Sequence, residues 1–339
     1  MASLEGSVVK SLGRRNDIVE PGEFDLIREI FAPLAAGNSA ALSLNDDAAI
    51  LPQRDGWETV VSTDTMVSGV HFLPTENPGA IARRLLRVNL SDIAAMGAEP
   101  VGYFLNLSLP SDALANWLTG FAVGLKQDQE DFDVSLLGGD TTSTPGELTL
   151  SVTMFAEVPA GQGIQRSTAQ PGDIVFVSGV VGDAMLGLQR MKEGVHAADK
   201  LVQRFQLPQP RLSLGRALRG VATAMADVSD GLIADLGHIC NASGLDVRLM
   251  VSDIPLSSGA RAAASAGQVS LAGLVSGGDD YELVFAAPRD YLDRVQQVSN
   301  NCGVPVTRIG VLVSGSGVVE LVDAEGDVIT VETPGYRHF

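Results

Sequence analysis

Short acidic segments, each preceded by an apolar stretch, recur along the chain and constrain its fold more than any other feature. They are Asp46-Asp47, Ser62-Thr63-Asp64, Asn89-Leu90-Ser91-Asp92, Gly138-Gly139-Asp140, Asp227-Val228-Ser229-Asp230 and Ser276-Gly277-Gly278-Asp279-Asp280. Carboxylates that follow apolar strands repel one another and are costly to bury unless a cation lies between them. Lys and Arg are scarce at these points, so the predicted cation is a metal. Hard oxygen ligands suit Mg²⁺, which proteins bind through a few carboxylates together with substrate phosphates.

The length of the chain and its net charge limit the number of domains and the classes of binding partner that are expected. A chain of 339 residues is too long for one ordinary core, which predicts two domains. The 41 acidic and 23 basic residues give a net charge of −18. So acidic a chain is not expected to bind nucleic acid or an anionic membrane, because both select basic surfaces. Phosphorylated small molecules are not excluded, provided that metal ions screen the charge.

Cysteine usage and hydropathy predict a cytoplasmic protein. Cys240 and Cys302 lack the spacing of a metal site and are expected to be free thiols in a reducing compartment. The N-terminal residues have no apolar leader, and no apolar run approaches the roughly 18 residues of a membrane span. Neither a signal peptide nor a transmembrane helix is therefore expected.

The order of strands and helices predicts an α/β (α+β) fold in two domains. Residues 1–20 are polar and aperiodic, as in a flexible extension. A stretch rich in Pro, Gly and Gln at 158–172 favours a boundary between domains of residues 21–157 and 158–339. Helices are expected at 23–34, 78–96, 113–126, 183–193, 212–221, 232–242 and 289–301. Strands are expected at 48–51, 58–62, 101–109, 134–137, 148–157, 173–178, 245–251, 282–287, 307–313, 318–321 and 328–331.

Each acidic segment taken alone has a structural alternative. Asp64, expected at a strand end, taken alone fits an Asx-turn that caps the strand better than a metal site. Asp92 lies on an apolar helix face beside Asn89 and could cap a neighbouring loop. Gly138-Gly139-Asp140 could be only a tight turn, and Asp230 only the N-cap of the helix that follows. The recurrence of the pattern favours a shared metal and phosphate site over independent turns.

Motifs of other phosphate- and metal-binding classes are absent from the sequence. It contains no P-loop, no protein-kinase motif set, no complete Gly-x-Gly-x-x-Gly and no zinc-binding His or Cys pattern. Of the scattered histidines, only His71, just after the Asp64 segment, is positioned to meet a ligand.

The motifs in combination resemble the thiamine-monophosphate kinase family over nearly the whole chain. This family belongs to the superfamily of aminoimidazole-ribonucleotide synthetase, selenophosphate synthetase and the hydrogenase-maturation dehydratase. The resemblance rests on residues 62–65, 88–97, 138–142, 227–232 and 276–283. It implies the two-domain ATP-binding fold of the aminoimidazole-ribonucleotide synthetase type, with N-terminal domains paired as a β-barrel homodimer. The implied reaction is Mg²⁺-assisted, in-line transfer of the ATP γ-phosphoryl group to thiamine monophosphate, without a general base.

The resemblance also implies roles for individual residues. Implied metal ligands are Asp47, Ser62, Thr63, Asp64, Asp92, Asp140, Asp227 and Asp230. Implied ATP contacts are Gly139, Asp140, Arg166 and Ser229, and implied contacts to thiamine monophosphate are His71, Asp279, Thr333 and Tyr336. The sequence departs from the family at Asn45, where Gly is usual, at Asp279, where Glu is usual, and at Thr333-Pro334, where an aromatic residue is common.

Alternative functions follow from the same residues. The sibling enzymes selenophosphate synthetase and the hydrogenase-maturation protein require cysteines that residues 1–45 and the C-terminal Phe339 do not provide. Aminoimidazole-ribonucleotide synthetase would lack the segment 276–283. A non-catalytic sensor of nucleotides or thiamine phosphates is the alternative of a different class.

Overall fold

The computed structural model describes residues 23–46, 48–110, 115–195 and 198–336. The predicted extension at residues 1–20 and the predicted ligand Asp47 lie outside these ranges. The strands are β1 Trp57–Val67, β2 Glu99–Pro110, β3 Ser135–Thr144, β4 Thr149–Pro159, β5 Ile174–Ser178, β6 Ala224–Asp227, β7 Leu245–Met250, β8 Leu283–Ala287, β9 Val306–Ser314 and β10 Val319–Val322. The α-helices are α2 Glu23–Leu26, α3 Pro78–Ala95, α4 Ala115–Phe132, α5 Asp183–Lys192, α6 Lys200–Gln206, α7 Leu212–Ala217, α8 Leu232–Ser243, α9 Ser258–Ser265, α10 Leu271–Ser276 and α11 Leu292–Cys302.

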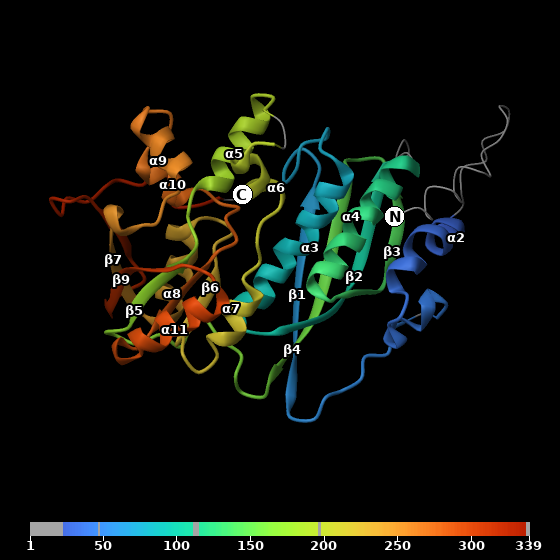
Figure 1. Cartoon of the computed structure of the whole chain (residues 1–339), viewed down its shortest axis with the longest axis horizontal. Coiled ribbons are helices and arrows are strands. Elements are labelled where there is room, and N and C mark those ends of the chain that lie inside the picture. The colour runs from blue at the N-terminus through green and yellow to red at the C-terminus, as the bar shows by residue number, and fades with distance from the viewer. Residues whose placement is uncertain (1–22, 47, 111–114, 196–197, 337–339) are drawn as a thin grey trace.

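Each half of the chain forms one β-sheet. The first half forms a four-stranded sheet of order β1-β4-β2-β3, and the second a six-stranded sheet of order β10-β7-β9-β5-β8-β6. In Figure 1 the first half lies on the right, the second half on the left, and α3 between them. Helix α3 contacts β1 and β4 of the first sheet and also α7 and β6 of the second half. It is therefore shared by both halves.

The two sheets differ in how they are covered. The first sheet buries one face under α3 and α4, and β4 alternates between buried and half-buried residues along its whole length. Its other face is open, with Val61 54% exposed. In the second sheet both faces are covered around β5: Val175 and Val177 of β5 join one core cluster, and Ile174 and Phe176 join another. Strands β5, β6 and β8 are accordingly buried at every position.

Local sequence signals account for the boundaries of α3. The Asn77 side chain accepts hydrogen bonds from the N–H groups of Gly79 and Ala80, and Pro78 occupies the first helical position. The helix stops at Met96, and Gly97 follows with a φ of +66°, a conformation that glycine adopts without steric cost. The predicted helix at 78–96 is confirmed.

Some predicted elements are wrong. Residues 48–51 form no strand, because the Ile50 N–H donates to the Ala40 carbonyl at 2.9 Å instead of to a neighbouring strand. Residues 328–331 contribute only an isolated bridge at Val328. Asp64 does not end its strand, and Gly138-Gly139-Asp140 is not a loop, since pairing with β4 and β2 continues past both. The elements β6, α6, α9 and α10 were not predicted.

Among the described residues, no helix has both the length and the hydrophobicity that a membrane span requires.

Candidate active site

Helix α3 and strand β1 are joined by two side-chain hydrogen bonds at the centre of the molecule. Ser62 and Asp64, two residues apart, point to the α3 side of β1. Ser62 Oγ donates to Asp92 Oδ2, and the Asp64 N–H donates to Asn89 Oδ1 at 3.1 Å. Asn89 is fully buried and also donates to the Leu85 carbonyl at 2.9 Å, which fixes its amide orientation. The Asp64 and Asp92 carboxylates are thereby brought to the same face of α3.

The end of β6 reaches the same place from the second half of the chain. Ser91 Oγ donates to Asp227 Oδ2 at 2.8 Å, and Asp227 is only 2% exposed. Asp230 follows in the loop before α8. Segments of β1, α3 and the β6–α8 loop therefore place four predicted metal ligands together: Asp64, Asp92, Asp227 and Asp230. We call them the junction acids.

The junction acids interact through their charges. Burial, followed by the charges of Asp92 and Asp230, raises the pKa of Asp64 to about 7. Burial, followed by the charges of Asp92 and Asp235, raises the pKa of Asp227 well above its ordinary value. Burial also raises the pKa of Asp92, while its bond from Ser62 and the charge of Arg166 act in the opposite direction. Such a group of acids favours a bound cation, which would stabilise the ionised forms.

Asp235 supports the loop that carries Ser229 and Asp230. One of its oxygens accepts hydrogen bonds from the N–H groups of Ser229, Asp230 and Gly231 at 3.0–3.1 Å. Burial, followed by the charge of Asp230, raises its pKa to about 7. Asp235 was not among the predicted site residues, although an acid in the first turn of a helix is a known signal of N-terminal capping. Its ligand atoms and those of Asp230 and His238 lie within 4.8 Å of one another.

Thr63 and Asp140 do not join the junction acids within one chain. Thr63 points to the open face of the first sheet, where its hydroxyl donates to the Val152 carbonyl at 3.0 Å. Asp140 is exposed on β3, which β2 and β4 separate from β1. Through the sheet register, Asp140 lies opposite Asn106, Asn106 opposite Ser151, and Ser151 opposite Thr65. Three interstrand spacings separate the two edge strands by about 14 Å.

A cavity of about 350 Å³ lies beside β3. Gly139 and Asp140 line it together with apolar residues that include Phe31, Leu44 and Phe104. Gly139 is required here, because a Cβ atom at this position would lie 1.9 Å from the Leu105 carbonyl oxygen. Asn45 and Asp46, which precede the predicted ligand Asp47, also line this cavity.

The predicted substrate residues approach the Asp230 loop from two sides. The Asp279 N–H donates to the Ser229 carbonyl at 2.7 Å, and the Tyr336 N–H donates to the Asp230 carbonyl at 3.0 Å. Thr333 is exposed in the segment leading to Tyr336. His71 follows the end of β1, and its Nδ1 accepts the Val67 N–H at 3.0 Å.

Within the described ranges, two cationic residues near the junction are relevant to the site, Arg166 and Arg84. Arg166 is exposed, and its charge counteracts the burial of Asp92 and of Asp235. The buried Arg84 of α3 donates to Asp279 at 2.7 Å and was not predicted as a site residue.

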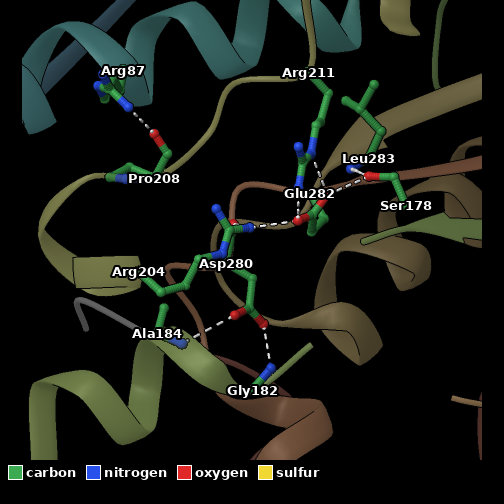
Figure 2. Close-up of polar contacts among 10 residues, drawn as sticks. All are labelled: Arg87, Ser178, Gly182, Ala184, Arg204, Pro208, Arg211, Asp280, Glu282 and Leu283. Atoms are coloured by element: carbon green, nitrogen blue, oxygen red, sulfur yellow. Dashed lines mark hydrogen bonds and ion pairs between the residues drawn. The ribbon is translucent and has the colours of Figure 1, made fainter. Parts of the chain in front are cut away.

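Asp280 and Glu282, next to Asp279, have a structural role (Figure 2). Asp280 accepts hydrogen bonds from the N–H groups of Gly182 at 2.6 Å and Ala184 at 3.2 Å, at the start of α5. The fully buried Glu282 accepts bonds of 2.5–2.6 Å from Ser178, Arg204 and Arg211. We call these two residues the paired acids, because donors satisfy their carboxylates within the fold.

Comparison with protein families gives matches in both halves. Residues 45–158 match the family model "AIR synthase related protein, N-terminal domain", and residues 170–323 match "AIR synthase related protein, C-terminal domain". The chain is 46% identical to thiamine-monophosphate kinase of Caulobacter vibrioides over 325 residues, covering 94% of this chain and 91% of the relative. It is 38% identical to thiamine-monophosphate kinase of Escherichia coli K12, covering 94% and 98%.

Solved structures resemble the chain over a similar extent. The crystal structure of thiamine-monophosphate kinase from Stenotrophomonas maltophilia K279a superposes with a TM-score of 0.79 at 38% identity, covering 91% of this chain and 98% of that one. The structure of AaThiL complexed with AMPPCP and TMP superposes with a TM-score of 0.75 at 28% identity, covering 96% and 99%. The hydrogenase maturation protein HypE in complex with ATP shares the fold, with a TM-score of 0.77 at 19% identity, covering 93% and 96%.

Proposed function

The chain belongs to the AIR synthase related protein family, and we propose that within it this chain is a thiamine-monophosphate kinase. It transfers the γ-phosphoryl group of ATP to thiamine monophosphate, giving thiamine diphosphate and ADP. The observation that carries the proposal is the convergence of the junction acids in a chain that matches such kinases along nearly its whole length. The family resemblance and the two-domain α/β fold predicted from the motifs are confirmed.

Magnesium ions fit the donor set at the junction. Carboxylate and hydroxyl oxygens are hard ligands, and the mutual repulsion of Asp64, Asp92 and Asp227 is relieved by a cation. We propose that the junction acids and Ser62 hold Mg²⁺, with Asp47, Thr63 and Asp140 completing the set. When bound, the ions neutralise the charge of two polyanionic substrates and align them.

A general base is not required for this reaction. A phosphate monoester has its second pKa near 6, so the attacking oxygen of the acceptor is already anionic at neutral pH. The role of the protein is to bring the two phosphate groups together in line and to exclude water. No residue is therefore assigned as an acid or base catalyst.

The cavity beside β3 is the proposed site of the ATP base. Its apolar walls suit an aromatic ring, and Gly139 allows a phosphate group to approach the backbone closely. Arg166 and Ser229 are the proposed contacts on the second half. The thiamine moiety is proposed to meet His71, Asp279, Thr333 and Tyr336.

We further propose that the protein is a homodimer paired through the open face of the first sheet. Val61 is exposed there, and Phe104 and Phe155 form an edge-to-face pair with centroids 5.6 Å apart. Apolar side chains on an uncovered sheet face favour a second copy as the cover. A dimer would also account for the distance between Asp64 and Asp140, because Asp140 would then serve the site of the other copy. The two free cysteines fit a cytoplasmic location.

Co-expression of two inactive variants tests the shared site. If each site combines Asp64 of one copy with Asp140 of the other, mixed dimers of Asp64→Asn and Asp140→Asn contain one intact site. Activity would return to about a quarter of the wild-type value, because half of the dimers are mixed and each has one working site. A mixture as inactive as either variant alone would contradict the shared site.

Turnover tests the proposed function directly. Purified protein is incubated with ATP, Mg²⁺ and thiamine monophosphate, and thiamine diphosphate and ADP are measured together, with free thiamine as the control acceptor. Equal amounts of both products, and none from free thiamine, are expected. Formation of ADP without thiamine diphosphate would favour a sibling enzyme. Tight ligand binding without turnover would favour a sensor.

A further inference from the structure

Arg84 is a buried cation whose role in the site is not explained by the metal ligands. Its Nη2 donates to Asp279 Oδ1 at 2.7 Å, and its guanidinium lies 3.6 Å from the centroid of the Phe205 ring. The residue is only 3% exposed. Its Nε and Nη1 make no hydrogen bond within the described part of the chain. A buried arginine is costly unless it is paired, so its ion pair with Asp279 is important to both residues.

Arg84 is one of several residues on α3 whose side chains donate hydrogen bonds to residues of the second half of the chain. Arg84, Arg87 and Ser91 are spaced i, i+3 and i+7, which places them on one side of the helix. Arg87 Nη1 donates to the Pro208 carbonyl at 3.0 Å (Figure 2), and Ser91 donates to Asp227. The same face of α3 therefore positions a junction acid and the predicted substrate residue Asp279.

The backbone of Asp279 is held independently of Arg84. Asp279 has a φ of +71° and Tyr281 a φ of +50°, both unusual for residues other than glycine. Their N–H groups donate to the carbonyls of Ser229 and Val228, each at 2.7 Å. A Cβ atom at Gly278 would lie 2.4 Å from the Ser229 carbonyl oxygen, so the two segments are in direct contact. With the backbone fixed, the direction of the Asp279 carboxylate is set by its side-chain partners.

Other groups near the ion pair do not replace Arg84 in this role. Glu76 is close enough for the charges of Arg84 and Asp279 to act on it, but its carboxylate already accepts the Leu73 N–H at 2.6 Å. The Tyr281 hydroxyl lies 3.4 Å from Asp279 Oδ1, at the limit of a hydrogen bond. Arg84 is thus the only described cation that forms an ion pair with Asp279.

We propose that Arg84 is a positioning residue for the acceptor substrate: it holds the Asp279 carboxylate towards the thiamine moiety and thereby sets the affinity for thiamine monophosphate. The inference rests on the proposed function and adds to it a residue that acts through Asp279. It assigns no role to Arg84 in binding ATP.

Steady-state kinetics of Arg84→Gln, with Arg83→Gln as the matched control, test this role. Arg83 is the preceding residue of α3 and pairs instead with Asp128 and Asp131. For Arg84→Gln, we expect KM for thiamine monophosphate to rise about tenfold, because the part-exposed Asp279 keeps its charge but loses the partner that directs it, with KM for ATP unchanged. Arg84→Lys should recover most of the affinity, because it keeps the charge. Arg83→Gln should leave both KM values near wild type.

A folded Arg84→Gln variant with an unchanged KM for the acceptor would overturn the proposal. If this variant does not fold, Asp279→Asn is compared with the double variant Arg84→Gln/Asp279→Asn, which leaves no unpaired charge. Because Arg84 acts through Asp279, both should raise KM for the acceptor equally. A further rise on removing Arg84 would show an independent role and refute it. Wild-type protein that fails to phosphorylate thiamine monophosphate would refute the proposed function instead, and these outcomes are distinguishable.

Discussion

The junction acids and the paired acids lie far apart in the sequence but near one another in the fold, where the backbones of Asp279 and Glu282 bond to those of Ser229 and Val228, and their carboxylates have different partners. Glu282 has Arg204 and Arg211 on its carboxylate, and Asp280 has the N–H groups of α5 (Figure 2). The described side chains that donate to the junction acids are the hydroxyls of Ser62 and Ser91. The fold supplies arginines or backbone N–H groups where an acid only supports structure. It supplies fewer such partners to the junction acids, where we propose that an external cation binds.

The largest effect is expected from neutralising a junction acid. Asp64→Asn should lower kcat by about 10³-fold, since it removes a charge that we propose holds Mg²⁺ in the transition state. Without metal, the variant should be at least as stable as wild type, because repulsion from Asp92 and Asp230 disappears. Turnover and thermal unfolding measure the two quantities.

The exposed Asp55→Asn, in the turn before β1, is the control for this change. It should alter neither turnover nor stability. Near-wild-type turnover of Asp64→Asn would contradict the assignment of the junction as the metal site.

The opposite pattern is expected for a paired acid. Glu282→Gln leaves the half-buried Arg204 and Arg211 around a fully buried position without their counter-charge, which should lower the free energy of unfolding by about 3–5 kcal/mol. The turnover of the protein that remains folded should change little. Urea denaturation followed by circular dichroism measures the loss. A stable Glu282→Gln variant would remove the distinction between the two groups of acids.

Long regular elements and local motifs were predictable from the sequence because their signals are local. Helix α3 was predicted correctly because Pro78 and Gly97 mark its ends. Strands β2 and β4 were predicted correctly because apolar and polar residues alternate over a long stretch in each. The Gly-Gly-Asp segment was misassigned as a loop, because glycine hides the alternation and pairing of β3 depends on β2, about 35 residues earlier in the chain.

The residue types of the candidate site could be predicted from the sequence, but which of these residues lie together within one chain could not. Motifs pointed to Asp64, Asp92 and Asp227, but no local signal separates them from Asp140 on β3, the edge strand of the first sheet opposite β1. The pairing of Arg84 with Asp279 joins positions 195 residues apart, so it depends on the tertiary fold alone. Asp235 was within reach of sequence reasoning, because it lies in the first turn of a helix.

A smaller effect is expected from pH in the absence of metal. Asp64 and Asp235 have pKa values raised to about 7, against about 4 in an unfolded chain. Between these values the folded protein binds protons that the unfolded chain does not. The free energy of unfolding should therefore fall as pH rises from 4 to 7, by about 1 kcal/mol per pH unit for each group.

Saturating Mg²⁺ should flatten this dependence, because the ion stabilises the charged junction acids. Burial also raises the pKa of Asp280 to about 7. Because Asp280 is one of the paired acids, its contribution to the pH dependence of the free energy of unfolding should remain when Mg²⁺ is present. Equilibrium unfolding at several pH values, with and without the metal, measures both parts. An unchanged slope with Mg²⁺ would contradict metal binding at the junction.

The smallest effect is expected at an exposed ion pair with nearly the same chemistry as the pair of Glu282. Arg248 of β7 donates to Glu320 of β10 through Nη2 at 2.7 Å and Nε at 3.0 Å. The side chains are 63% and 37% exposed, so water compensates either charge when its partner is removed. Glu320→Gln should cost less than about 1 kcal/mol in urea denaturation, and salt should reduce that cost further. If Glu320→Gln lowered the free energy of unfolding as much as Glu282→Gln, the geometry of the ion pair rather than its burial would determine how much each acid contributes to stability. The junction acids would then need an explanation other than their lack of a cation in a buried place.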